Sequence, residues 1–325
     1  MNIINVNSKD TMPELAVKMC YSRDDFTHII INRCPVFLVN KKTMDLLAPP
    51  YSYQTYDANC ISLKTEEVLK RLEICVNENE NVENPNYENI SKIVNSFWDD
   101  VGSCSMQDMK KMPVCGLYIN KITTNHLDII KEDKISEYLG SEAIFLCIAR
   151  IIEWESKSSF TSMNSEIDIS VLISSVWFHE ATHAWMKTSK KIYTQHWGYI
   201  IEESLANAYC SRVTKYMLKH NVFNIESELF LHTKLDQQPF PYSSWAFWEE
   251  DMNGMVQLWR DKDQYRVKLP KRARRIPLHY VRGRNTDSVV DQISDLLDYT
   301  DKIKNINNTE LMWKLLAIKI VNWCY

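Results

Sequence analysis

The chain has 325 residues, of which 45% are hydrophobic and 25% are charged, and its formal net charge at pH 7 is -4. This composition is typical of a globular protein and excludes a disordered or fibrous chain. The small negative charge excludes a general electrostatic attraction to nucleic acid or to anionic membranes.

The N-terminal sequence MNIINVNSKD lacks the basic start and apolar run of a signal peptide, and the chain contains no apolar run of roughly 18 residues or more that could cross a bilayer. We therefore expect a cytoplasmic protein without a membrane segment. The nine cysteines are an odd number and include no C-x-x-C pair. We expect mostly buried thiols, and neither a disulfide framework nor a cysteine zinc cluster. Nothing in the sequence indicates the oligomeric state.

The first part of the chain combines short apolar runs with a helical pattern. Residues 27–40 (THIIINRCPVFLVN) contain two apolar runs separated by Pro35, which predicts two short strands. Residues 65–76 have apolar side chains at helical spacing, which predicts a helix capped by Thr65.

An asparagine-rich, acidic stretch follows at residues 76–89 and contains Pro85. Its few apolar residues predict a loop and the best position for a domain boundary. We expect an N-terminal region of unknown role at 1–89 and a second region at 90–325 with a basic C-terminal part, or else one compact body that contains both.

Beyond this stretch, residues 90–101 predict a helix and residues 113–120 a strand. Residues 141–154 open with an apolar run that fits either a buried strand or the start of a helix, and periodicity does not choose between them. Residues 167–187 and 199–219 show long helical patterns. Short strands mixed with long helices predict an α+β fold.

Residues 179–183 read His-Glu-Ala-Thr-His within the apolar, helix-compatible run 171–186. On a helix, residues four apart lie on one face, so His179 and His183 can reach the same tetrahedral metal ion. Glu180 is rotated by about 100° from His179 and can act as general base toward a zinc-activated water. Two histidines and a glutamate in an apolar helix need strong partners, and a metal ion is one.

The third metal ligand is expected from the second long helix, where Glu203 lies twenty residues beyond His183. An acidic first helical turn, favoured by the helix dipole, is the alternative explanation for Glu202 and Glu203. Adjacent residues point about 100° apart, so only one of the two can face the first helix. Glu203 shares its face with Asn207 and small side chains, whereas Glu202 shares its face with the bulkier Tyr209. We predict Glu203.

This combination resembles the gluzincin branch of the H-E-x-x-H metallopeptidases, in which a glutamate on a following helix completes the zinc site. The spacing is similar to that of thermolysin-like enzymes, and the segment from Glu203 to Asn207 (ESLAN) resembles the E-x-x-A-N segment of ImmA/IrrE-like bacterial peptidases. The resemblance covers about forty residues, 171–210. It implies a zincin-like core, Zn2+ held by His179, His183 and Glu203, and Asn207 as a partner for a metal-bound imidazole.

The same resemblance implies an exposed strand above the metal, where a substrate backbone pairs by strand addition. Residues 141–148 are the segment that we nominate for it. It also implies a tyrosine, histidine or arginine that stabilises the oxyanion, and Tyr242, His232 and His279 are candidates. For each of them, simple packing in the core or at the surface is the alternative.

We therefore expect a zinc-dependent endopeptidase that hydrolyses an intracellular protein or peptide, with Glu180 as general base. The alternative is a non-catalytic interaction module with a structural or vestigial metal site. Such a module would bind an acidic partner or nucleic acid through the basic region 260–284, which can equally form a solvated face. Glu180 argues against the alternative, because a structural metal site has no use for a base beside the metal.

Overall fold

The computed structural model describes residues 1–21, 27–48, 56–77, 87–105, 113–156, 165–220, 225–248, 256–257, 259–260 and 306–325. The chain divides into two compact units. Unit 1 comprises Met1–Tyr53, Lys110–Lys187 and Ala206–Gln238, and unit 2 comprises Gln54–Met109, Thr188–Leu205 and Pro239–Tyr325. These units interleave along the chain, whereas the sequence predicts a division at residue 89.

Unit 1 contains a four-stranded sheet in the order β1-β2-β4-β3. The strands are β1 (Ile3–Asn5), β2 (Val36–Leu38), β3 (Gly116–Ile119) and β4 (Ala143–Leu146). β1, β2 and β4 run parallel, while β3 is antiparallel to β4 with Gly116 opposite Leu146. β4 is paired on both sides and fully buried, and β3 forms one end of the sheet as far as the structure describes it.

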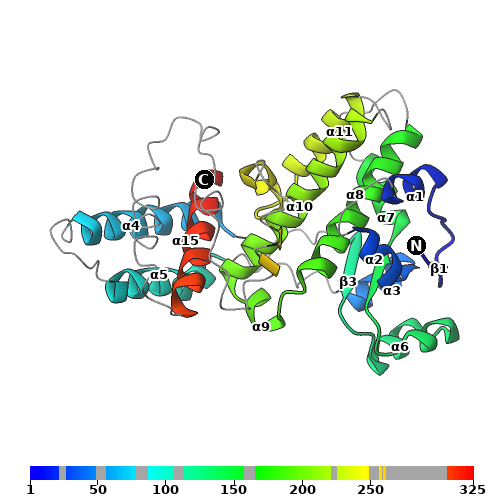
Figure 1. Ribbon diagram of the computed structural model, residues 1–325, viewed down its shortest axis with the longest axis horizontal. Coiled ribbons are helices and arrows are strands. Elements are labelled where there is room, and N and C mark those ends of the chain that lie inside the picture. The colour runs from blue at the N-terminus through cyan, green and yellow to red at the C-terminus, as the bar shows by residue number, and fades with distance from the viewer. Residues whose placement is uncertain are drawn as a thin grey trace. The chain divides into compact units, whose positions relative to one another are not determined.

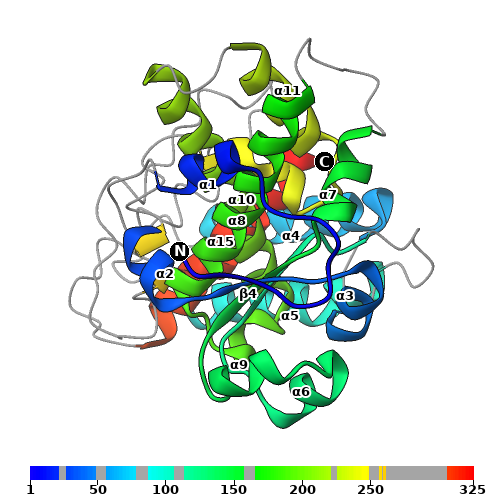
Figure 2. The same ribbon diagram turned by 90° about the vertical axis from the view of Figure 1, so that its right-hand side faces the viewer.

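The helical elements of unit 1 are α1 (Glu14–Tyr21), α2 (Thr27–Arg33), α3 (Lys41–Leu47), α6 (Thr124–Ile130), η3 (Asp133–Tyr138), α7 (Ile148–Ser156), α8 (Ser165–Met186) and α11 (Ile225–Asp236). Successive side chains of a strand point to opposite faces of the sheet. On one face, Phe37 and Phe145 stack within a core that includes side chains of α3 and α6. The other face contacts α8, which also contacts α1, α2, α7 and α11 (Figure 2).

Unit 2 is built from helices in the part that the structure describes. They are α4 (Ala58–Asn77), α5 (Tyr87–Val101), η2 (Gly102–Cys104), α9 (Lys190–Tyr193), η4 (Tyr242–Trp248) and α15 (Ile306–Cys324). α15 contacts α4, α5 and η4, and α4 also contacts α5 (Figure 1). The long helix α10 (His196–Lys219) begins in unit 2 and ends in unit 1.

The buried stretch of α8 carries hydroxyl side chains that form hydrogen bonds within the helix itself. All residues from 170 to 178 are buried. The hydroxyls of Ser174, Ser175 and Thr182 donate to carbonyls of the preceding helical turn at 2.7 to 2.9 Å. Hydroxyl side chains on a helix can bond back in this way, so their burial needs no partner outside the helix. Imidazole and carboxylate side chains buried on α8 need partners from elsewhere.

Several of the predicted elements are confirmed. The helices predicted at 90–101, 167–187 and 199–219 correspond to α5, α8 and α10, and the strand predicted at 113–120 is β3. The segment 141–154 contains both of the elements considered for it, since β4 is followed directly by α7. One small mixed sheet among many helices fits the predicted α+β class. None of the described helices has the length and apolarity needed to cross a membrane.

Two local predictions are wrong. The apolar run predicted as the first short strand is the helix α2, whose buried residues Thr27, Ile30 and Ile31 recur at helical spacing. α4 begins at Ala58, so Thr65 lies inside it and donates its hydroxyl to the Ile61 carbonyl. Short apolar runs and single capping residues fit more than one structure. Most of the loop predicted at 76–89 lies outside the described residues.

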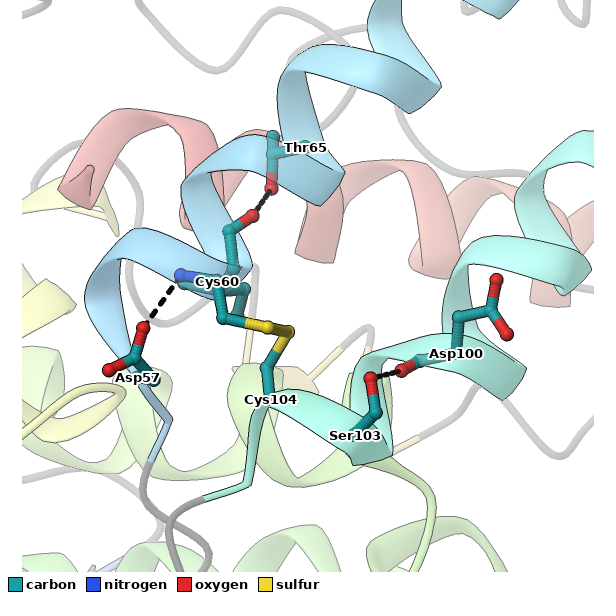
Figure 3. The surroundings of a disulfide bond; sticks show 7 residues. Asp57, Cys60, Thr65, Asp100, Ser103 and Cys104 are labelled. Atoms are coloured by element: carbon teal, nitrogen blue, oxygen red, sulfur yellow. Dashed lines mark hydrogen bonds between the residues drawn. A yellow bond between two sulfur atoms is a disulfide. The ribbon is translucent and has the colours of Figure 1, made fainter.

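Cys60 and Cys104 form a disulfide that joins the first turn of α4 to η2 (Figure 3). The Asp57 carboxylate accepts a hydrogen bond from the Cys60 amide at 2.7 Å and so caps α4. The sequence predicts mostly buried thiols and no disulfide framework, and neither the odd number of cysteines nor their spacing indicates this single pair. The expectation of buried thiols holds for five of the seven free cysteines.

A buried lysine connects two helices that pack against α8. The Lys234 ammonium, on α11, donates to the carbonyls of Trp154 and Glu155 in the last turn of α7, at 2.5 and 3.1 Å. The last carbonyls of a helix have no partner within the helix, and Lys234 supplies one. Burial lowers the pKa of this lysine.

We expect Lys234→Met to lower the free energy of unfolding by about 1–3 kcal/mol, because the partly buried carbonyls at the end of α7 would lose their donor. Lys70→Met, at an exposed position of α4, is the matched control and should change stability by no more than about 0.5 kcal/mol. Urea unfolding followed by circular dichroism measures both. Equal stabilities of the two variants would contradict the capping role.

Candidate metal centre

His179, His183 and Glu203 come together in the structure. One potential ligand atom of each lies within 4.8 Å of the other two. Among the described residues, this is the one group of three or more histidine, cysteine, aspartate or glutamate side chains close enough to hold a metal ion. The three residues predicted as metal ligands therefore form a group that can bind a metal.

The two imidazoles present the same type of nitrogen to each other. Nε2 of His179 lies 3.0 Å from Nε2 of His183. Two imidazole nitrogens bound to one tetrahedral zinc ion at about 2.0–2.1 Å would be roughly 3.3 Å apart, so little adjustment is needed to share a cation. The donor set of two imidazoles and a carboxylate also suits zinc chemically.

The other ring nitrogen of His179 is held by an amide. Nδ1 lies 2.7 Å from Oδ1 of Asn207. An amide oxygen can only accept, so Nδ1 carries the proton and Nε2 keeps the lone pair that a metal needs. The Asn207 amide nitrogen in turn donates to Oε1 of Gln238 at 2.5 Å, which fixes the amide with its oxygen toward His179. Asn207 thus lies where the sequence resemblance implies, whereas no motif marks Gln238.

The face of α10 that carries Glu203 also carries the residues that touch α8. Asn207 contacts His179, and one turn further the Cys210 thiol donates to the Ser175 carbonyl of α8 at 3.1 Å. Burial raises the pKa of Cys210, so this side chain is a neutral thiol packed between two helices. The helix phase inferred from the sequence is therefore the one that the structure shows.

Glu202 points elsewhere, as the helix phase requires. Its Oε2 accepts a hydrogen bond from the Trp259 indole at 3.4 Å. Both glutamates are buried, at 4% and 2% exposure for Glu202 and Glu203. α10 begins at His196 and has no acidic residue in its first turn, so an acidic first helical turn does not explain this pair.

Tyr193 contacts the carboxylate of the metal group directly. Its hydroxyl donates to Oε1 of Glu203 at 2.6 Å. Burial, and next the negative charge of Glu203, raise the pKa of Tyr193 well above its usual value, so it remains a protonated donor. Tyr193 lies in the segment between the two predicted helices, and the sequence carries no signal for its role.

Glu180 is buried and lies against β3. A Cβ atom on Gly116 would come within 2.8 Å of Oε1 of Glu180 and within 2.6 Å of Cγ1 of Val176. The absence of a side chain at Gly116 is therefore what allows β3 to lie so close to the carboxylate. This corrects the nomination of residues 141–148 as the exposed strand, because β4 is paired on both sides and β3 forms the end of the sheet as described.

Two of the oxyanion candidates are placed by the structure. The Tyr242 hydroxyl accepts a hydrogen bond from that of Tyr199 at 3.4 Å. His232, on α11, lies with Nε2 2.9 Å from the Ser211 hydroxyl. Ser211 is about 12 Å beyond Glu203 along the axis of α10, because a helix rises about 1.5 Å per residue. The contact that the structure shows for His232 is thus with Ser211, and its role at the oxyanion stays a prediction.

The third oxyanion candidate, His279, lies outside the described residues. The same holds for the basic region 260–284, apart from Arg260 at its start. Both expectations stay predictions. The alternative of an interaction surface in this region is likewise untested.

No protein-family model matches the chain, and no curated protein or solved structure matches it either. The metal group is therefore supported by the chemistry and geometry of the chain's own residues.

We expect wild-type protein to bind about one zinc ion per chain and Glu203→Ala to weaken this binding strongly, because two histidines alone hold zinc poorly. Glu202→Ala removes a neighbouring buried carboxylate that faces Trp259, and should bind zinc like the wild type. Asn207→Ala should be intermediate, about ten- to a hundredfold weaker. Competition with a chromophoric chelator measures all four proteins. The reverse order of the two glutamate variants would overturn the assignment.

Proposed function

We propose that this protein is a zinc-dependent endopeptidase with a zincin-like core, which hydrolyses a peptide bond with Glu180 as general base. The observation that carries the proposal is the convergence of His179, His183 and Glu203 on one point. Three protein ligands are the set of a catalytic zinc site, which keeps a position for water, whereas structural sites use four. Within the described residues, no fourth histidine, cysteine, aspartate or glutamate joins the group.

His179, His183 and Glu203 would hold the zinc ion, which would activate water and polarise the scissile carbonyl. Glu180 follows His179 directly on α8, and only 7% of its surface is exposed. Its carboxylate takes the proton of the attacking water and then delivers it to the leaving amine. Asn207 holds His179 in the tautomer that keeps Nε2 free of a proton.

The position of β3 supports a peptide as the substrate. An extended peptide binds to the free side of an end strand through backbone hydrogen bonds, which makes recognition independent of most side chains. Gly116 is part of β3 and lies against Glu180. A peptide paired alongside β3 would therefore run close to the proposed base.

We expect Glu180→Gln to retain zinc and the fold but to lose hydrolysis by more than about a hundredfold, because the amide keeps the shape of the side chain and cannot accept a proton. Fluorescently labelled casein is the first probe. New peptide termini in a lysate of the native host, compared between wild type and variant, would then identify natural substrates.

Two outcomes of this experiment would contradict the proposal. Normal cleavage by Glu180→Gln would show that another residue is the base. Wild-type protein that binds zinc but cleaves neither casein nor any protein of the lysate would favour the non-catalytic interaction module.

We also expect Gly116→Ala to retain zinc and to lower kcat, since the new methyl group would displace the Glu180 carboxylate and no metal ligand. The double variant Gly116→Ala with Val176→Ala removes the contact to Val176 but keeps the one to Glu180. It should remain as slow as the single variant. Recovery of kcat in the double variant would show that packing against Val176, and not the position of Glu180, is what the glycine protects.

A further inference from the structure

The short helix α9 links α8 to α10 and has its own cap. The Ser189 hydroxyl accepts a hydrogen bond from the Ile192 amide at 3.4 Å, and the Ser189 carbonyl accepts one from the Tyr193 amide at 3.0 Å. These bonds fix the single turn at whose end Tyr193 stands. The direction of the Tyr193 side chain is thus set within the connection between the two long helices.

The lack of a side chain at Gly198 allows α9 to lie against the first turn of α10. A Cβ atom on Gly198 would lie 2.2 Å from the carbonyl oxygen of Ile192 and 2.9 Å from its carbonyl carbon. The obstructing atoms belong to the backbone and cannot rotate away, so no other residue fits without shifting α9. Gly198 precedes Glu203 by five residues on the same helix. α9 is therefore fixed to the helix that carries the proposed metal ligand.

The ring of Tyr193 is held as well as its backbone. It packs edge-on against the ring of Tyr199, with 5.6 Å between the centroids, and the Tyr199 hydroxyl donates to that of Tyr242. The Tyr193 hydroxyl reaches Oε1 of Glu203 at 2.6 Å. Tyr193 therefore contacts the Glu203 carboxylate, whereas the hydroxyl of Tyr199 is directed to Tyr242.

We propose that Tyr193 is a positioning residue that orients the Glu203 carboxylate for metal binding. A carboxylate can turn about its terminal bond and bind a metal through one oxygen or both. With Oε1 held by Tyr193, the group is fixed in one orientation and offers its other oxygen, so less conformational freedom is lost when the metal binds. The inference rests on the proposed metal centre, and it does not depend on peptide hydrolysis.

A simpler role would be to satisfy a buried carboxylate, which needs a donor with or without a metal. The two roles predict different measurements. If the Tyr193 hydroxyl only stabilises the fold, its removal lowers the stability of the metal-free and zinc-bound protein equally and leaves zinc affinity unchanged. If Tyr193 is a positioning residue, removal of the hydroxyl lowers zinc affinity and reduces the increase in Tm that zinc produces.

The test compares Tyr193→Phe with Tyr199→Phe in the full chain. Both variants remove one hydroxyl from neighbouring rings, and one of these hydroxyls bonds to Glu203. We expect Tyr193→Phe to bind zinc about ten- to a hundredfold more weakly, the usual effect of losing a partner of a metal ligand. Tyr199→Phe should match the wild type. Chelator competition gives the affinities, and the visible spectrum of the cobalt-substituted protein should change in Tyr193→Phe alone.

Gly198→Ala tests the attachment of α9. It should weaken zinc binding in the same direction as Tyr193→Phe, and the double variant should show no further loss, because both changes break the same contact. Additive losses would overturn the role of α9. Wild-type zinc affinity in Tyr193→Phe would overturn the inference and leave the metal centre intact, whereas a wild type that binds no zinc would overturn both.

Discussion

The burial of ionisable side chains on α8 and α10 is the constraint on which the rest of the structure depends. Both helices are largely buried, and hydroxyl groups such as that of Thr182 are accommodated by bonding back to their own helix. His183, Glu180 and Glu203 are buried too, and a charged or polar group without partners costs several kcal/mol in such surroundings. Each of them therefore needs a polar or charged partner. At the metal group, the buried side chains of His183 and Glu203 come close enough to share a metal ion as their partner.

Hydrogen bonds around the group define which atoms remain for a metal. Gln238 orients Asn207, and Asn207 assigns the proton of His179 to Nδ1. Tyr193 takes one oxygen of Glu203. Asn207 and Tyr193 each hold one polar atom of a proposed ligand, as surrounding side chains commonly do at metal sites. Two of the three proposed ligands are therefore oriented by neighbouring side chains.

Glu180 is also constrained sterically. β3 comes so close at Gly116 that a single methyl group would displace the carboxylate. The strand that supplies this constraint also forms the end of the sheet in the described part of the chain. The proposed base and the strand proposed to bind the substrate are therefore in direct contact.

The sequence by itself determined what lies within single helices. The spacing of His179 and His183 places them on one face, and the phase of α10 separates Glu203 from Glu202, because helical geometry is fixed and local. Short apolar runs carry less information, because a run as short as that of α2 fits a strand as well as a helix. Only the tertiary structure decided the order of the strands, the disulfide between Cys60 and Cys104, and the approach of Tyr193 to Glu203. These depend on packing between elements whose partners no local periodicity specifies.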